Sequence, residues 1–507
     1  MQFGPAAMLQ ESVAIVIGCV MVAYGIEFLF AYFDDPQEPR RISPPFPVVG
    51  HLLGYLYHGF NYLNIVGQDA DFEIYTVGVL NYKVYVTHTP RLLNLMQKSK
   101  SLSVQPILQA ANRIHSGASN DAHALFEHQY EDFRVRTREA LSPGPHLDQQ
   151  SLRMGKQSVI ELDRILEEPG PEIELLAWVK HVVLQGVSAG FYGMQHPFRD
   201  SEMEQAMWDW DKHRPALHLG IDPLGKGAQA RAKVVEALGV YVQDGVSEET
   251  SHLVRERQRS LQEGGIDTED ALKMQAFLND GNFNIVPTLY WTIYDIFSRP
   301  ELLEAIRNEV ADRAIVDSGD GGFTLDISAV KTKCHLLLSS FQETQRIRHM
   351  LSTSRSVLED TLLDGQYLLR KGNLLYLPAQ PIHHNPDIWG PRATEFDPYR
   401  FVRGASNSKI LPSNFLPWGS APHICPTRQF ISAGILVHTA IMAARIDLTP
   451  VKGRTWMEEP AVRWVEIATL PTARENVYLK VTPRKEGSGK WRVTTGRSQT
   501  AVPLVSG

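Results

Sequence analysis

The sequence holds little cysteine, and its three residues, Cys19, Cys334 and Cys425, limit what they can do. Three cysteines cannot build a disulfide framework and their spacing matches no zinc module, so thiols in a reducing compartment are expected. A basic excess is lacking too. The net charge of −7 argues against a general nucleic-acid binder. No Asn-x-Ser/Thr acceptor for glycosylation occurs, which is compatible with a cytosolic catalytic domain.

Lys and Arg are also missing from residues 1–11, a short segment that precedes an apolar run. Residues 12–33 are 22 positions with one charge, Glu27, and are long enough to cross a bilayer as a helix. Because a basic n-region and a convincing cleavage site are absent, a signal anchor is favoured over a cleaved signal peptide. Arg40 and Arg41 follow the run and favour a cytoplasmic catalytic domain. We therefore expect a single-pass membrane protein, of the endoplasmic reticulum, facing the cytosol.

The rest of the chain predicts one mainly α-helical domain with small β-sheets. A length of 507 residues suggests about three domains, yet no clear linker divides them. Prolines make residues 34–48 a stiff connector, residues 49–486 form the catalytic domain, and residues 487–507 look like a frayed tail. The predicted elements are strands at 72–80 and 82–88, helices over 90–298 and 330–350, a small sheet over 362–379, and irregular chain over 381–424.

Cys425 differs from the other cysteines because of its neighbours. It lies in SNFLPWGSAPHICPTRQF, residues 413–430, with Trp418 and Gly419 shortly before it and a predicted helix beginning near Pro426. A sulfur at a helix N-terminus faces the positive end of the dipole, which stabilises a thiolate and suits a metal ligand. A buried cysteine before an ordinary helix fits this pattern equally well.

Two further motifs stand in a fixed order before Cys425. Glu343 and Arg346 are three residues apart on a predicted helix, so both charges share one face. Arg400 lies in the irregular segment, within FDPYRF. Taken alone, the first motif could be a surface ion pair and the second a solvated loop arginine.

Together, these motifs resemble the cytochrome P-450 superfamily over essentially the whole chain. The resemblance implies a P-450 fold with haem b (iron protoporphyrin IX), and Cys425 as the thiolate ligand that pushes electron density onto the iron. It implies that Glu343, Arg346 and Arg400 form a buried triad behind the haem. By the same resemblance His423 contacts a haem propionate, while Trp418 packs beside the thiolate and precedes Gly419.

This chain departs from the family pattern at several positions. Thr427 stands where the family usually has Gly two residues after the cysteine, and Ala421 where it usually has Gly four residues before. Both replacements are small, so haem binding is expected to survive.

The oxygen-activation helix, expected over 277–303, departs further. Aligned on Gly281, the usual acid position holds Phe283 and the usual Thr position holds Asn284, with Pro287 three residues later. This arrangement resembles the bile-acid sterol hydroxylases and prostacyclin synthase. An Asn amide can donate a hydrogen bond or hold water but cannot act as the usual acid–alcohol relay. We assign Asn284 and Gly281 a distal-pocket role; the alternative is that Asn284 only bends the helix with Pro287.

Two groups of residues favour structural roles. Arg134, Arg136 and Arg138 could each supply a propionate partner, but a charged helix face is the simpler interpretation. His383 and His384 do not share a face, so we interpret them as loop residues rather than as a metal pair.

The resemblance favours a monooxygenase that uses O₂ and electrons from NADPH through a membrane reductase. The alternatives are a reductase-independent isomerase or dehydratase like prostacyclin synthase, and a non-catalytic haem- or sterol-binding membrane protein. Apolar side chains expected in the pocket, such as Ile285, Val286, Leu289 and Met350, suit a small lipophilic substrate. We expect a terpenoid, steroid-like or meroterpenoid scaffold, used in secondary-metabolite biosynthesis.

Overall fold

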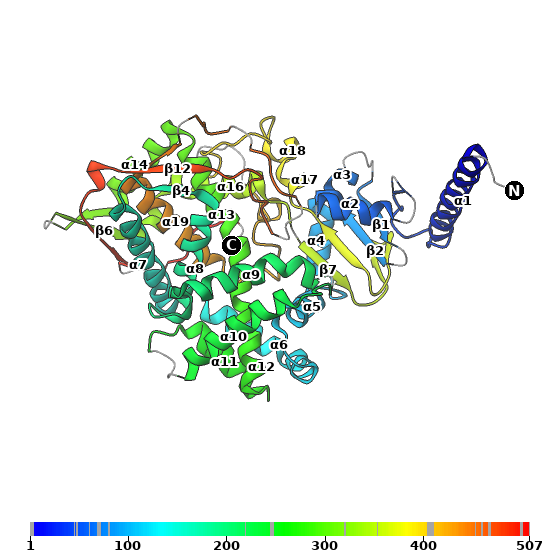
Figure 1. Ribbon diagram of the computed structural model, residues 1–507, viewed down its shortest axis with the longest axis horizontal. Coiled ribbons are helices and arrows are strands. Elements are labelled where there is room, and N and C mark those ends of the chain that lie inside the picture. Colours follow the sequence, from blue (N-terminus) through cyan, green and yellow to red (C-terminus); the bar gives the residue numbers. More distant parts are fainter. Residues whose placement is uncertain are drawn as a thin grey trace.

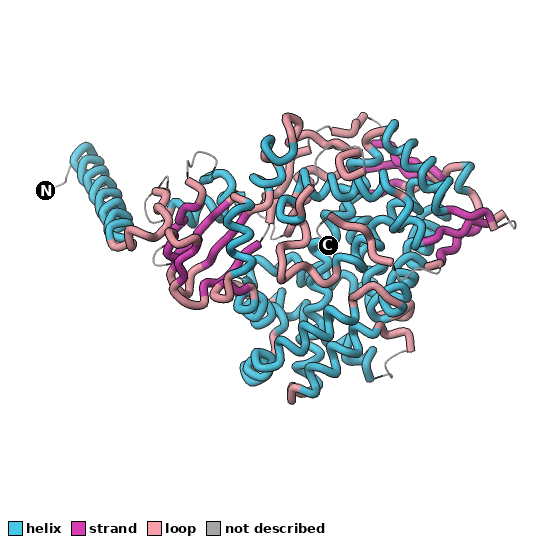
Figure 2. Tube along the Cα trace, turned by 180° about the vertical axis from the view of Figure 1, so that it is seen from behind, coloured by secondary structure: helices cyan, strands magenta, loops and turns pink. Residues whose placement is uncertain are grey.

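The computed structural model confirms a mainly helical protein with small sheets (Figures 1 and 2). It describes residues 5–44, 46, 49–59, 61–67, 72–79, 82–218, 220–243, 248–318, 321–351, 353–402, 410–451, 453–457, 460–464, 468–496 and 500–505.

Helix α1, Pro5–Tyr32, projects from the rest of the chain in Figure 1 and coincides with most of the predicted anchor at 12–33. Among the described residues, no helix is both long enough and apolar enough to span a bilayer. The side chains of residues 12–17 lie outside the described ones. The transmembrane helix therefore stays a prediction.

The five-stranded sheet next to α1 contains both predicted early strands. β1, Ile74–Val79, pairs antiparallel with β2, Tyr82–Thr87. β10, Leu374–Leu377, runs parallel to β2 and antiparallel to β7, Thr353–Val357, which also pairs with β3, Leu102–Ser103. The small sheet expected over 362–379 is divided: β8, Thr361–Leu363, and β9, Tyr367–Leu369, pair with each other in a two-stranded sheet, whereas β10 joins the five-stranded one. Chain segments far apart in sequence thus meet in one sheet.

The helices α2 to α12 make up most of the first half of the chain. Sequence signals explain several of their ends: Ser119 caps α6 by accepting from the backbone N–H of Ala122, and Pro145 begins α7. The bounds are Gly50–His58 (α2), Asn61–Gly67 (α3), Pro90–Lys98 (α4), Gln105–Ser116 (α5), Asn120–Ala140 (α6), Pro145–Glu167 (α7), Leu175–Tyr192 (α8), Ser201–His218 (α9), Lys226–Gln243 (α10), His252–Glu263 (α11) and Thr268–Ala276 (α12), with the 3₁₀ turn η1 at Pro197–Arg199.

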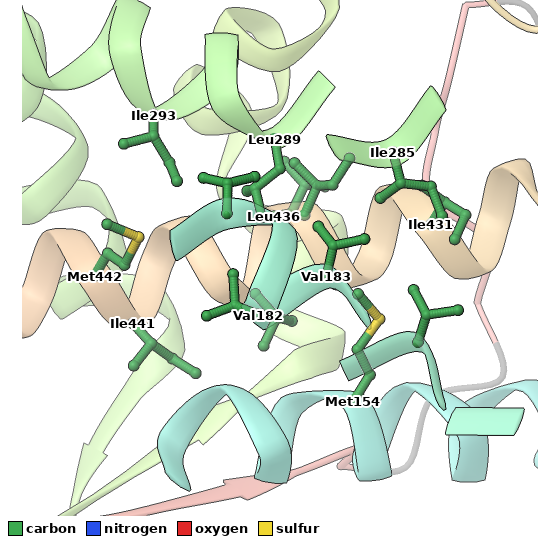
Figure 3. Packing of buried hydrophobic residues seen from close by; sticks show 14 of the residues in the cluster. Met154, Val182, Val183, Ile285, Leu289, Ile293, Ile431, Leu436, Ile441 and Met442 are labelled. Carbon is green, nitrogen blue, oxygen red and sulfur yellow. The ribbon is translucent and has the colours of Figure 1, made fainter. Parts of the chain in front are cut away.

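The main core forms where α13, Asn282–Phe297, and α19, Arg428–Arg445, meet α7 and α8. Ile285 and Leu289 of α13 point toward Leu436 of α19 and Val183 of α8 (Figure 3). Each of these side chains is buried. Ile285 and Leu289 thus pack into the core, and their expected place in a substrate pocket stays a prediction.

The helix expected over 330–350 is divided in two at Cys334. α15 spans Ile327–Lys333 and α16 spans His335–Arg348, whereas Cys334 itself has non-helical angles, φ −87° and ψ 77°. Glu309 of α14, Pro300–Ala314, accepts hydrogen bonds from the backbone N–H groups of Leu336 and Leu337 at 2.9–3.0 Å. This contact gives hydrogen-bond acceptors to the backbone N–H groups in the first turn of α16, and it stabilises the break between α15 and α16.

The short elements of the irregular segment and the remaining strands complete the fold. They are α17, Gln380–His383; α18, Pro386–Trp389; the 3₁₀ turns η3, Pro412–Asn414, and η4, Lys485–Gly487; and the strands β4, Glu172–Glu174; β5, Ile315–Asp317; β6, Gly322–Asp326; β11, Ile446–Pro450; and β12, Tyr478–Pro483. β12 lies between β11 and β4 in a three-stranded sheet.

The C-terminal segment 487–507 is not frayed where the structure describes it. β13, Lys490–Thr494, pairs in parallel with β6. Farther on, the buried Val502 exchanges two hydrogen bonds with Gln429 of α19. The expectation of a loose tail is wrong because this segment supplies its own strand and buried apolar groups.

Candidate active site

The structure brings the three predicted residues Glu343, Arg346 and Arg400 together. Arg346 donates to both carboxylate oxygens of Glu343 at 2.8 Å, and neither side chain is exposed to solvent. Arg400 Nε donates to Glu343 Oε1 at 3.1 Å from the irregular segment. A buried ionic network of this kind is stable only when every partner stays in place.

The triad also fixes the backbone of the irregular segment. Arg346 donates to the carbonyl of Ala393, and Arg400 donates to the carbonyl of Trp389 at 3.0 Å. The backbone N–H of Asp397 donates to Glu343 Oε1 at 2.9 Å. These bonds hold a chain without regular structure in one conformation behind the cysteine.

The loop before Cys425 is a series of tight turns that presents the sulfur beside a helix start. Gly419, at φ +79°, adopts the left-handed conformation that glycine permits at little cost. The backbone N–H of Cys425 donates to the carbonyl of Trp418 at 2.9 Å. α19 begins at Arg428, two residues later than Pro426 suggested, and Cys425 is half-buried just ahead of it.

A basic cluster lies close to this loop. Burial, followed by the positive charges of Arg355 and Arg134, lowers the pKa of His423. Arg355 is 3% exposed and donates to Ser420, and no carboxylate among the described residues pairs with it. Burial lowers the pKa of Arg355 to about 10. The cluster therefore has the charge and burial to hold an anionic group.

Arg355 is the residue that sequence reasoning missed. It occupies an inward-facing position of β7, between the buried Thr353 and Val357. A charged side chain at a core-facing position of an alternating strand was the available signal. Of the α6 arginines, Arg134 lies near His423 but also pairs with Glu131 on its own helix, whereas Arg136 pairs with Asp132 and Glu263 near the surface.

These residues fit the haem that the predicted site requires. The cluster suits carboxylates, and in the cysteine loop the indole N–H of Trp418 is buried with no hydrogen-bond partner among the described residues. Gly281 is exposed, and a Cβ added there meets nothing within 4 Å, so space is open next to α13. His383 accepts from the backbone N–H of Leu416 at 3.0 Å, which confirms a structural role for this residue.

The oxygen-activation helix expected over 277–303 is not one continuous helix. A 3₁₀ turn, η2 at Phe277–Gly281, leads into α13, and α14 begins at Pro300. Asn284 Oδ1 accepts from the backbone N–H of Thr469 at 2.9 Å, and its carbonyl accepts from Thr288 Oγ1 at 2.7 Å. No described residue accepts from Asn284 Nδ2, which keeps its donor capacity. Asn284 therefore does more than bend the helix.

A pocket of about 500 Å³ borders the same part of α13. Phe283, Val286 and Pro287 form an apolar part of its lining, and Arg214 places its guanidinium carbon 3.3 Å from the ring centroid of Phe283. Its other lining residues mix apolar and charged types: Leu176, Lys180, Gln205, Trp208, Asp209, Asp211, Lys212, Pro215, Arg463, Ala468 and Thr472.

Comparison with known proteins agrees with this geometry. The pattern that defines the cytochrome P450 family matches residues 41–433. The chain is 30% identical to "Cytochrome P450 monooxygenase nodJ" of Hypoxylon pulicicidum over 98% of this chain and 99% of the relative. It is 24% identical to a cytochrome P450 monooxygenase of Gibberella zeae over 88% of each. The solved structure "Retinoic acid bound cyanobacterial CYP120A1" shares the fold, with a TM-score of 0.69 and 15% identity over 88% of this chain and 99% of that one. The chain therefore belongs to the cytochrome P450 family and is a cytochrome P450 monooxygenase, an oxidoreductase that uses O₂, a substrate and a redox partner.

Proposed function

We propose that this monooxygenase holds haem b through Cys425 and hydroxylates a lipophilic terpenoid, steroid-like or meroterpenoid substrate in secondary metabolism. The observation that carries the haem assignment is the position of Cys425 just before α19, in a loop whose Ser420 accepts from the buried Arg355, which pairs with no carboxylate among the described residues. When bound, a haem with a thiolate ligand supplies the activation of O₂.

The residues around Cys425 have different proposed roles in binding the haem. Arg355 and Arg134 would supply positive charge to the haem propionates and His423 would supply an N–H donor, because both arginines lie close enough to His423 to influence it electrostatically. Trp418 packs beside the sulfur. The triad of Glu343, Arg346 and Arg400 touches no reactant in this scheme and positions the segment that carries the cysteine.

The substrate class rests on the surfaces near α13. The lining of Phe283, Val286 and Pro287 suits an apolar skeleton, and the charged residues of the same pocket suit a polar substituent on it. Asn284 Nδ2 offers a hydrogen-bond donor to substrate or water near the haem.

We further propose that the protein sits in the endoplasmic reticulum membrane with its catalytic domain in the cytosol and takes electrons from NADPH through a membrane reductase. Support comes from the predicted span at 12–33 and from α1 side chains that the fold leaves exposed, such as Phe28 at 68% and Tyr32 at 72%.

The ferrous carbon-monoxide difference spectrum tests the haem assignment. The parent and a Cys334→Ala control should both show a thiolate-type Soret band, and Cys425→Ala should lose it. A parent that binds no haem, or a spectrum that Cys425→Ala shares, contradicts the assignment. Turnover of candidate lipids with and without reductase then tests the proposed substrate class and the proposed source of electrons.

A further inference from the structure

Thr427 occupies the N-cap position of α19 without capping it. Threonine at this position normally accepts a hydrogen bond from a backbone N–H in the first helical turn. Here the backbone of Thr427 is already helical, at φ −81° and ψ −3°, and its side chain makes no capping bond. The first turn of α19 therefore gains nothing from this hydroxyl.

The hydroxyl instead faces the proposed iron ligand. Thr427 Oγ1 lies 3.2 Å from Cys425 Sγ, and no other described residue provides a partner for it. A cysteine that binds a metal is a thiolate and carries no proton. The hydrogen bond can then run in one direction only, from the Thr427 hydroxyl to the sulfur.

We infer that Thr427 is a positioning residue that tunes the axial thiolate. A hydrogen bond to a ligand sulfur withdraws charge from it and raises the reduction potential of the metal centre. The glycine that the family usually has at this place offers no side-chain donor, so this contact is a property of the present chain. The inference rests on the proposed haem ligation by Cys425.

Substitutions at Thr427 separate the hydroxyl from the volume of the side chain. Thr427→Val keeps the shape and removes the donor, whereas Thr427→Ser keeps the donor. Thr439→Val is the matched control, because Thr439 lies on the same helix, is buried, and has a hydroxyl without a partner. All variants are compared as full-length haem-loaded protein without substrate.

Two measurements that need neither substrate nor reductase report on the sulfur. The first is the ferric–ferrous midpoint potential in a redox titration with a chemical reductant. The second is the iron–sulfur stretching frequency in the resonance Raman spectrum. Thr427→Val should shift the potential to more negative values and raise the stretching frequency. Thr427→Ser should stay near the parent, and Thr439→Val should match it.

An unchanged potential and an unchanged stretching frequency in Thr427→Val overturn the inference, provided that variant keeps a thiolate-type spectrum. If Thr427→Val loses haem, Thr427→Ala removes the same donor with less bulk and is judged by the same criterion. A parent without a thiolate-type spectrum overturns the proposed function together with this inference. A thiolate-ligated parent with an unmoved variant overturns the inference alone.

Discussion

Asp295 of α13 and the partly exposed Arg348 at the end of α16 form a two-pronged ion pair, with N–O distances of 2.6 and 3.0 Å. The Asp295 side chain is fully buried and also accepts from Thr344 Oγ1 at 3.0 Å. The guanidinium of Arg348 lies 3.8 Å from the centre of the Trp291 ring. A second ionic network thus joins the distal helix to the helix that carries Glu343.

Asp295→Asn should lower the free energy of unfolding by about 3–5 kcal/mol, because it leaves the charge of Arg348 without its partner. Thermal unfolding of the haem-loaded protein measures the change. Arg113→Gln is the control: Arg113 and Glu127 pair at the surface, each 48% exposed, and such a pair contributes roughly 0–1 kcal/mol. A loss in Asp295→Asn no larger than in this control contradicts the prediction.

A charged, partly exposed histidine joins three other helices. His181 of α8 lies between Glu161 of α7 and Glu204 of α9, at 3.0 and 2.9 Å. Burial lowers the pKa of His181, but its hydrogen bonds to the two carboxylates outweigh this and raise the pKa to about 9. Because the folded pKa exceeds the ordinary value of 6.5, the stability it adds is complete below 6.5 and is lost as the pH rises through about 9.

His181→Gln should therefore be less stable than the parent below pH 6.5, and the gap should narrow as the pH rises through about 9. Melting temperatures of both proteins across this range give the test. In a Glu161→Gln background the pH dependence of the gap should shrink, since one carboxylate charge is gone. A gap that stays constant with pH would show that His181 contributes through packing alone.

The order of motifs was enough to predict the triad and the turn before Cys425, because these residues lie in short, characteristic segments. The break at Cys334 could not be predicted, since it depends on Glu309, which meets the new helix start only in the folded chain. Arg355 was overlooked because an arginine on a short strand resembles a surface residue until its neighbours are placed. Likewise, the burial of Val502 could not be predicted, since its partner Gln429 lies far away in the sequence and meets it only in the folded chain.

The contact between Gln429 and the C-terminal segment should contribute measurably to stability. Gln429 accepts from the backbone N–H of Val502 at 2.7 Å and donates to its carbonyl at 3.2 Å. Gln429→Ala leaves both backbone groups unpaired in a buried setting, which costs about 1–3 kcal/mol for a buried group. The variant should melt earlier and lose its C-terminal segment faster to a carboxypeptidase. Gln262→Ala, at an exposed position, should behave as the parent. Equal digestion rates would contradict the prediction.

Substitutions at Asn284 distinguish a role in hydrogen bonding to a ligand in the distal pocket from a structural role. Its Oδ1 is committed to the backbone N–H of Thr469, so only Nδ2 can donate toward a ligand. Asn284→Asp keeps the acceptor and removes the donor, whereas Asn284→Ala removes both. If Nδ2 acts during turnover, Asn284→Asp should melt like the parent yet form product roughly 100-fold more slowly, the cost typical of losing one preorganised donor. The rate of product formation at saturating substrate and reductase provides the measurement. If Asn284→Asp instead turns over like the parent and only Asn284→Ala fails, Asn284 acts by holding the segment around Thr469, and the distal assignment is wrong.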